Sequence, residues 1–167
     1  MTSVSLVQVN FQTGPHHLNS YYLPYSVGAL WSFVEQNKRI KENYDISNII
    51  FRREPLEDLI LKHKDTDIVL LSLYIWNKNY CFKLAEKLKE AYPDIIILMG
   101  GPELPWRNDD FFEKYPFIDS IVIGEGELAL QHILLQHLDG QEIDKVNKFE
   151  RIKELDLPSP YLNGMFD

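Results

Sequence analysis

The stretch Asp94-Ile-Ile-Ile-Leu-Met-Gly-Gly-Pro-Glu103 decides the fold of this chain. In it, a short run of apolar and mostly β-branched residues ends abruptly in two glycines, and a glutamate follows within two residues. The same arrangement returns in Ser120-Ile-Val-Ile-Gly-Glu-Gly-Glu127. A run that is apolar on both faces is typical of a parallel strand, because helices cover both sides of a parallel sheet. We therefore expect both groups of glycines at the carboxyl edge of one sheet, where open α/β sheets bind their ligands.

Five strands of this kind alternate with helices. Apolar runs predict strands over residues 4–10, 44–51, 67–73, from 94 onward and 119–123, and helical spacing predicts helices over 24–38, 77–91 and 125–138, with shorter helices near 55 and 110. This alternation predicts an α/β fold, a three-layer α/β/α Rossmann-like (flavodoxin-like) sandwich around a five-stranded parallel sheet. The expected strand order, 2-1-3-4-5, opens a crevice between the first and third strands. Residues 10–25 and 72–77 line it, with residues 100–103 and 124–127 beyond.

The last part of the chain has a different pattern. Beyond residue 141 no strand or helix period is visible, and Pro158 and Pro160 interrupt the final segment. Such a segment is typical of a linker. We therefore expect one domain over residues 1–146 and a linker over residues 147–167.

Composition limits the possible functions. The 167 residues suffice for one domain with an ordinary core. A net charge of -8 argues against a nucleic-acid surface, which needs clustered Lys and Arg. No apolar run approaches the roughly 20 residues of a membrane-spanning helix, and the N-terminus lacks the pattern of a signal peptide. The expected location is therefore cytoplasmic.

Three common classes of protein with this fold fit the sequence poorly. A phosphoacceptor receiver would need an aspartate after the third strand, where this chain has Ser72 and Leu73. A flavodoxin would need a hydroxyl-rich loop after the first strand, and Gln12-Thr-Gly14 matches it only faintly. A dinucleotide fold would need Gly-x-Gly-x-x-Gly, whereas Gly124-Glu-Gly126 is followed by Ala129 and carries glutamates that would repel phosphate.

Three segments together resemble one family. They are the strand end at Ser72, Met99-Gly-Gly-Pro-Glu103 and Val122-Ile-Gly-Glu-Gly-Glu127. Their combination resembles the cobalamin-binding (B12-binding) domain that precedes the catalytic barrel in cobalamin-dependent radical S-adenosylmethionine enzymes. Pro24-Tyr-Ser-Val-Gly-Ala-Leu30 resembles the helix start after that family's first strand, and Leu157-Pro-Ser-Pro-Tyr161 resembles the connection to the barrel. The resemblance thus spans essentially the whole chain.

The resemblance implies a cobalamin site at the carboxyl edge of the sheet and no catalytic residue in this chain. Small residues there could admit the nucleotide tail of the corrinoid between the strands, because glycine has no Cβ. Glutamates at a helix start also complement the helix dipole, which is the simpler role for Glu125 and Glu127. The expected cofactor-binding residues are Ser72, Leu73, Tyr74, Trp76, Asn77, Gly100, Gly101, Pro102, Glu103, Gly124, Glu125, Gly126 and Glu127.

Two departures from the family pattern are informative. Many cobalamin domains have Asp-x-His-x-x-Gly after the first strand, and no histidine here has an aspartate two places earlier. We therefore expect no histidine below the cobalt, although His16 and His17 lie in the corresponding loop. The family's iron-sulfur cluster needs three cysteines, and this chain has only Cys81, which we expect to be buried.

The resemblance therefore implies that the 4Fe-4S cluster and S-adenosylmethionine belong to a partner domain of a longer parent chain. That parent is expected to be a methyltransferase, and the present chain alone is expected to be inactive. One alternative is a degenerate scaffold that only docks the catalytic barrel, with Tyr74, Ile75 and Trp76 filling the crevice. Another is a flavin-binding or signalling domain that is complete in itself.

Overall fold

The computed structural model describes residues 1–15, 20–105, 107, 109–153 and 157–167. Its centre is a parallel sheet, and within these residues the sheet has six strands in the order β4-β1-β5-β6-β7-β8. The strands are β1 (Thr2–Val7), β4 (Tyr44–Ile50), β5 (Ile68–Ser72), β6 (Ile96–Gly100), β7 (Ser120–Ile123) and β8 (Val146–Lys148). The predicted fold class and the predicted order of the first five strands are confirmed, whereas the sixth strand was not predicted.

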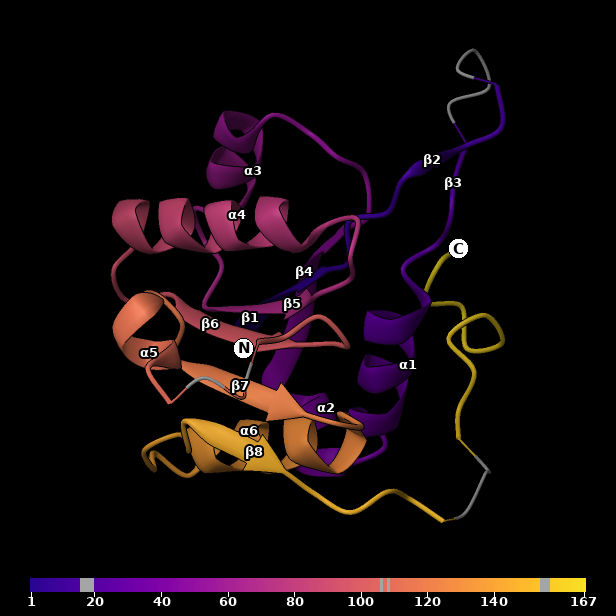
Figure 1. Ribbon diagram of the computed structural model, residues 1–167. Helices are drawn as coiled ribbons and strands as arrows, with labels where there is room; N and C mark the ends of the chain where they lie inside the picture. Colours follow the sequence, from indigo (N-terminus) through magenta and orange to yellow (C-terminus); the bar gives the residue numbers. More distant parts are fainter. Residues whose placement is uncertain (16–19, 106, 108, 154–156) are drawn as a thin grey trace.

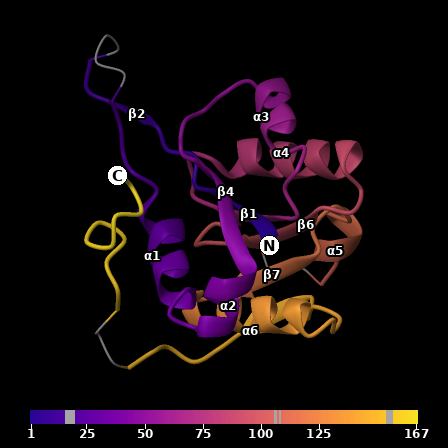
Figure 2. The same ribbon diagram turned by 180° about the vertical axis from the view of Figure 1, so that it is seen from behind.

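Helices cover both faces of the sheet (Figures 1 and 2). The helices α1 (Tyr25–Val34), α2 (Lys38–Asn43) and α6 (Glu127–Leu138) pack on one face, and α3 (Leu56–Lys62), α4 (Lys78–Ala91) and α5 (Phe111–Lys114) on the other. Each layer has its own buried cluster, which includes Trp31 and Ile133 on the first face and Leu84 and Leu88 on the second. Among the described residues, no helix is both long and apolar enough to cross a membrane.

The helix predicted over residues 24–38 is in fact two helices. Helix α1 ends at Val34, and α2 begins at Lys38 after a short turn. The side chain of Asn37 caps the start of α2 by accepting a hydrogen bond from the backbone N–H of Arg39 at 3.0 Å. Asparagine competes with the helical hydrogen bonds in this way, so it favours a new helix start over continuation of the old one.

Side chains alternate between the two faces along each strand, as strand geometry requires. In β5, Leu70 lies in the cluster under α1 and Leu71 in the cluster under α4. In β6, Leu98 and Met99 divide in the same way. The next residue that faces α1 is therefore Ser72 in β5 and Gly100 in β6. Small residues thus end both strands on the α1 side.

The C-terminal part of the chain is more ordered than a linker pattern predicts. Strand β8 pairs in parallel with β7, and buried Asn147 in it donates hydrogen bonds to Ser120 Oγ and to the Asp144 carbonyl. The final residues then pack on the outer side of α1, where the Tyr161 ring stacks on the Tyr25 ring at 5.6 Å. A short antiparallel pair, β2 (Gln12–Thr13) and β3 (Ser20–Tyr21), projects beside them (Figure 1).

Candidate functional site

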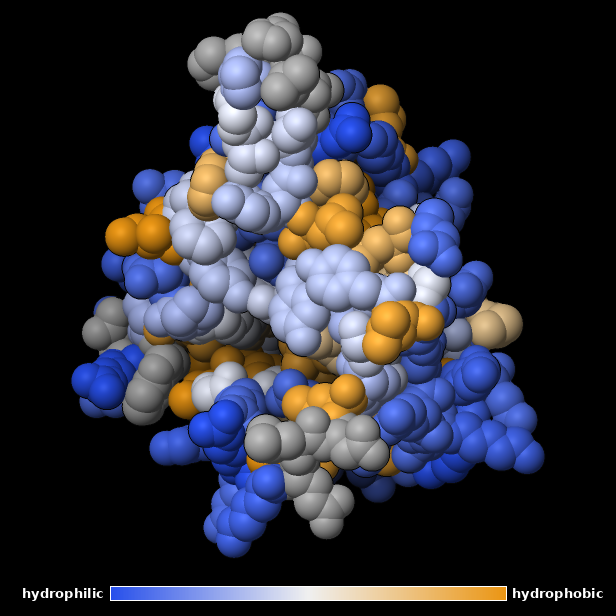
Figure 3. Space-filling view, turned by 90° about the vertical axis from the view of Figure 1, so that its right-hand side faces the viewer, coloured by the Kyte–Doolittle hydropathy of each residue, from blue (hydrophilic) through white to orange (hydrophobic). Residues whose placement is uncertain are grey.

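A cavity of about 570 Å³ lies at the carboxyl edge of the sheet, between α1, the start of α6 and the ends of β5, β6 and β7. Figure 3 looks onto this side of the molecule, where hydrophobic residues gather in a hollow. We call this space the carboxyl-edge cavity. Nine of the thirteen predicted site residues line it: Ser72, Tyr74, Gly100, Gly101, Pro102, Gly124, Glu125, Gly126 and Glu127.

The glycines of this edge serve different purposes. A Cβ on Gly101 would lie 2.5 Å from the Leu73 carbonyl oxygen, and its φ of 108° disfavours any other residue. Gly101 is therefore needed for the close approach of two backbones. Gly124 also has a positive φ, 84°, but a Cβ there would meet nothing within 4 Å. A Cβ on Gly100 would touch only Val122, at 3.5 Å. Larger side chains at these two positions would therefore project into open space.

Helix α1 forms the wall opposite the strands, and two contacts hold it in place. The Gln8 side-chain oxygen accepts hydrogen bonds from the backbone N–H groups of Ser26, at 2.9 Å, and Val27, at 3.3 Å. Gln8 thus satisfies amides that a helix N-terminus leaves free, which matters because Pro24 at the N-cap offers no side-chain acceptor. The hydroxyls of Ser26 and Tyr74 form a hydrogen bond that ties α1 to the loop after β5.

Four predicted site residues lie outside the cavity lining. Leu73 points to the opposite face because strand side chains alternate, and it is fully buried there. Asn77 donates to the carbonyls of Val9 and Ser72, at 3.0 Å each, and accepts from the Tyr74 N–H, so it fixes the turn after β5.

The other two of these four residues, Trp76 and Glu103, have partners of their own. The Trp76 indole N–H donates to the Val9 carbonyl, and its ring stacks on the Tyr74 ring at 4.6 Å. Trp76 therefore supports Tyr74 from behind and does not occupy the space. The Glu103 carboxylate lies 4.0 Å from the Lys78 ammonium.

The sequence reasoning missed the parts of the lining that come from the C-terminal segment. Arg151, Ile152 and Leu157 all line the cavity, although they belong to the stretch with no visible period. These residues reach the cavity only through the tertiary fold, and no local sequence pattern encodes that position. On α1 itself, the apolar residue Leu30 could be found from helical spacing, which turns it towards the sheet.

The charges of the cavity are mostly paired. The Glu125 carboxylate lies 2.9 Å from the Arg151 guanidinium, and both side chains are well exposed. Glu127 differs, because its Oε2 atom is buried and has no hydrogen-bond partner among the described residues. This oxygen is closed off from solvent, and the carboxylate lies in the first turn of α6, where it complements the helix dipole.

Neither the described histidines nor the cysteine contributes to the cavity. His63 is buried between Ser5 and Leu59, and burial lowers its pKa below the ordinary value. Cys81 is buried in the core, where desolvation raises the pKa of its thiol to about 12 and so keeps it protonated. His16 and His17 lie outside the described residues.

The remaining described histidines also have partners away from the cavity. His132 contacts Asp144, and His137 contacts Tyr44. No group of three or more metal-ligating side chains occurs in the part of the chain that the structure describes.

Comparisons with known proteins identify the family. Residues 34–134 match the sequence profile of the B12 binding domain. The chain is 35% identical to the cobalamin-dependent radical SAM methyltransferase TokK of Streptomyces tokunonensis, with 90% of this chain and 24% of that protein aligned. It is 32% identical to the 2-(S-pantetheinyl)-carbapenam-3-carboxylate methyltransferase of Streptantibioticus cattleyicolor, with 87% and 24% aligned.

A third relative, an uncharacterized methyltransferase of Pyrococcus horikoshii, is 27% identical over 62% of this chain. The chain spans about a quarter of the length of these three relatives. The matched profile covers strands β5 to β7 together with the glycine-rich loops that line the carboxyl-edge cavity. Sequence, fold and cavity agree, and the chain belongs to the B12-binding domain family.

Proposed function

We propose that this chain holds cobalamin at the carboxyl edge of its sheet, with the nucleotide tail of the corrinoid in the carboxyl-edge cavity. The observation that carries the proposal is the cavity itself, about 570 Å³ of open space above Ser72, Gly100 and Gly124. A ligand pocket of this size suits a slender group such as a nucleotide. The broad corrin ring would remain at the mouth.

The residues around the cavity have distinct parts in this proposal. Ser72, Gly100 and Gly124 leave room for the tail, and Gly101 keeps the two neighbouring loops close enough to shape the floor. Tyr74, held by Ser26 and backed by Trp76, offers an aromatic surface at the rim for the apolar face of the ring. Bound cobalamin would supply the methyl-group carrier, while the protein supplies binding and orientation.

The proposal extends to a parent protein. Two relatives that align along most of this chain are methyltransferases, and one of them is named as a radical SAM enzyme. We infer that the chain is the cobalamin-binding part of such a methyltransferase. A 4Fe-4S cluster and S-adenosylmethionine would then be bound by a partner domain of the same parent, since Cys81 is the only cysteine of this chain.

The domain boundary belongs to the same proposal. We place the cobalamin-binding domain at residues 1–146 and the connection to the partner domain at residues 147–167. The order of β8 and of the last residues means that this connection would be held against the domain and would not hang free. A cytoplasmic location stays a prediction.

Reconstitution tests the proposal directly. The purified chain is mixed with hydroxocobalamin, desalted, and examined by visible absorbance, with heat-denatured chain as the control for nonspecific carry-over. We expect stoichiometric corrinoid to remain with the folded chain. Colourless protein would instead favour the degenerate scaffold, and flavin fluorescence in the isolated protein would favour a flavin-binding domain. The open cavity favours cobalamin over the scaffold, because Tyr74 and Trp76 stack on each other and leave the space free.

A further inference from the structure

Two buried amide side chains follow strand β1. Along this segment Leu6 lies in the cluster under α1, and Val7 and Val9 lie in the cluster under α4. Because side chains alternate, Gln8 and Asn10 continue the face of Leu6 towards α1. Their exposed fractions are only 6% and 5%. A buried amide is costly unless it is hydrogen-bonded, so the partners of these two side chains indicate what they do.

Both amides hold the chain around the start of α1. The Gln8 oxygen accepts from the backbone N–H groups of Ser26 and Val27, the second and third residues of the helix. The Asn10 side-chain N–H group donates to the backbone carbonyls of two residues just ahead of the helix, at 2.9 and 3.3 Å. One side chain thus binds donors and the other binds acceptors. The segment after β1 therefore sets where α1 begins.

Gln8 supplies a capping group that the helix itself lacks. Pro24 at the N-cap has no side-chain acceptor, and the first turn of α1 contains no acidic residue. A capping acceptor usually comes from the N-cap residue. Here it comes from the end of a strand, so the first turn of α1 is tied to the sheet. Without it, two N–H groups of the helix would lose their partner, and the first turn would fray.

The residues that Gln8 holds belong to the wall of the carboxyl-edge cavity. Ser26 and Val27 line this cavity, whereas Gln8 lies outside the described lining. The hydrogen bond between Ser26 and Tyr74 also holds α1, but both of these residues line the cavity, where a ligand would compete with it. The bonds to Gln8 lie behind the wall. They can therefore hold α1 with the cavity empty or filled.

We propose that Gln8 is a positioning residue for the cofactor site, which fixes the first turn of α1 so that the wall of the cavity is formed before the corrinoid enters. This inference rests on the proposed function, because it concerns the wall of the same site. Gln8 makes no contact with the ligand in it. A wall that is already formed raises the affinity, since a ligand binds only those molecules whose site is competent.

Three variants separate this role from a general effect on stability. Gln8→Met keeps the length of the side chain and removes the acceptor, and Gln8→Glu restores an acceptor that suits the positive end of a helix. The control Asn37→Ala removes the capping acceptor of α2, a helix outside the described lining. Absorbance titration measures the affinity for hydroxocobalamin. Hydrogen exchange of the Ser26 and Val27 amides is measured in the cofactor-free chain, and urea unfolding measures stability.

We expect Gln8→Met to weaken hydroxocobalamin binding by about tenfold, the scale of a lost helix cap, because the first turn must then be ordered during binding. The exchange of the two amides should become faster by a similar factor. Gln8→Glu should restore the affinity and the slow exchange. Asn37→Ala should lower the urea midpoint and leave the affinity and the exchange of these amides unchanged.

Unchanged amide exchange in Gln8→Met would overturn the inference without any ligand, because other contacts would then hold the start of α1. Unchanged affinity of Gln8→Met would overturn it as well. An equal loss of affinity in Asn37→Ala, or in Gln8→Glu, would show that a capping acceptor at this position is not the cause. Failure of the unaltered chain to bind hydroxocobalamin would instead overturn the proposed function, whatever the amide exchange, and this inference with it.

Discussion

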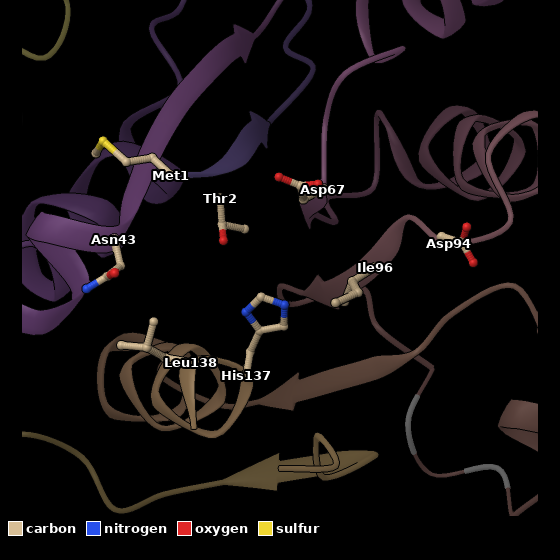
Figure 4. Close-up of a pocket in the computed structure, with 8 residues that line it drawn as sticks. All are labelled: Met1, Thr2, Asn43, Asp67, Asp94, Ile96, His137 and Leu138. Carbon is tan, nitrogen blue, oxygen red and sulfur yellow. The ribbon is translucent and has the colours of Figure 1, made fainter. Parts of the chain in front are cut away.

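The two edges of the sheet offer hollows of similar size but opposite character. The carboxyl-edge cavity measures about 570 Å³, and a hollow of about 460 Å³ lies at the amino edge. Figure 4 shows the lining of the amino-edge hollow, whose labelled side chains are spread around its rim and do not converge on one point. Volume alone therefore does not distinguish a binding site from a surface depression.

The difference lies in which ends of the helices face each hollow. At the amino-edge hollow, Asp67 accepts a hydrogen bond from the Ser3 N–H, and His137 contacts the Tyr44 hydroxyl. Helices α2 and α6 also end there, so the negative ends of their dipoles face the hollow. At the carboxyl edge, α1 and α6 begin, so the positive ends of their dipoles face the cavity. The direction of the strands thus gives one edge positive helix ends and room for a ligand, which is the general rule for open α/β sheets.

The largest loss of cobalamin affinity is expected when the carboxyl-edge cavity is filled. The variant Gly100→Leu places a side chain in the space above β6, and we expect it to weaken cobalamin binding by about a thousandfold. The fold should survive, because a Cβ at this position meets only Val122 at 3.5 Å. Absorbance titration measures the affinity, and thermal unfolding checks the fold. Thr2→Leu places the same side chain at the amino-edge hollow and should leave the affinity unchanged. Normal binding by Gly100→Leu would place the ligand elsewhere.

Alanine substitutions distinguish Gly101, which lies against the Leu73 backbone, from glycines that have open space around them. Gly101→Ala should lower the free energy of unfolding by about 3 kcal/mol, because it combines a positive φ with a backbone clash. Gly124→Ala at the carboxyl edge and Gly140→Ala at the amino edge have positive φ but open space, and should each cost about 1 kcal/mol. Urea unfolding of the three ligand-free variants measures the differences. Equal losses at all three positions would show that the close approach to Leu73 is unimportant.

Acid should weaken the fold through a site away from the cavity. The pKa of His63 is lowered from 6.5, chiefly by burial, because the folded protein disfavours the charged ring. The unfolded chain therefore takes up a proton first as the pH falls, so the stability is full above about 6.5 and declines below it until the folded pKa is passed. Urea unfolding at several pH values measures this decline. In His63→Gln the decline between pH 7 and pH 5 should be smaller, and an identical pH profile would contradict the assignment.

The smallest expected effect concerns the ion pair at the cavity mouth. Glu125 and Arg151 are well exposed, so their mutual coupling should be about 0.5 kcal/mol and should fade at high salt. A double-mutant cycle of Glu125→Gln and Arg151→Gln in urea unfolding measures it. A coupling several times larger would mean that the pair anchors the C-terminal segment over the cavity.

The sequence predicted the parts of the fold that local patterns encode. The apolar runs of β5, β6 and β7 and the amphipathic α4 gave the sheet, its order and its layers, because burial on both faces requires those patterns. Strand β8 was missed because Val146–Lys148 has only three residues and exposes two of them. Its place in the sheet depends on β7 and on the hydrogen bonds of Asn147, which are tertiary contacts.

The candidate site was predictable to the same extent. Glycines at strand ends marked the floor of the cavity, since a parallel sheet brings those ends together. The wall formed by Arg151, Ile152 and Leu157 was not predictable, because it comes from a segment without a period. The pairing of Trp76 with Tyr74 was also hidden, as both residues looked equally suited to face a ligand.

Gly28 links the far end of the chain to the cavity. A Cβ on Gly28 would lie 2.5 Å from the ring of Phe166, so the aromatic ring rests directly on the backbone of α1. The inner side of α1 thus faces the cavity, and its outer side packs against the C-terminal residues. A displacement of those residues would therefore shift α1 and change the width of the cavity.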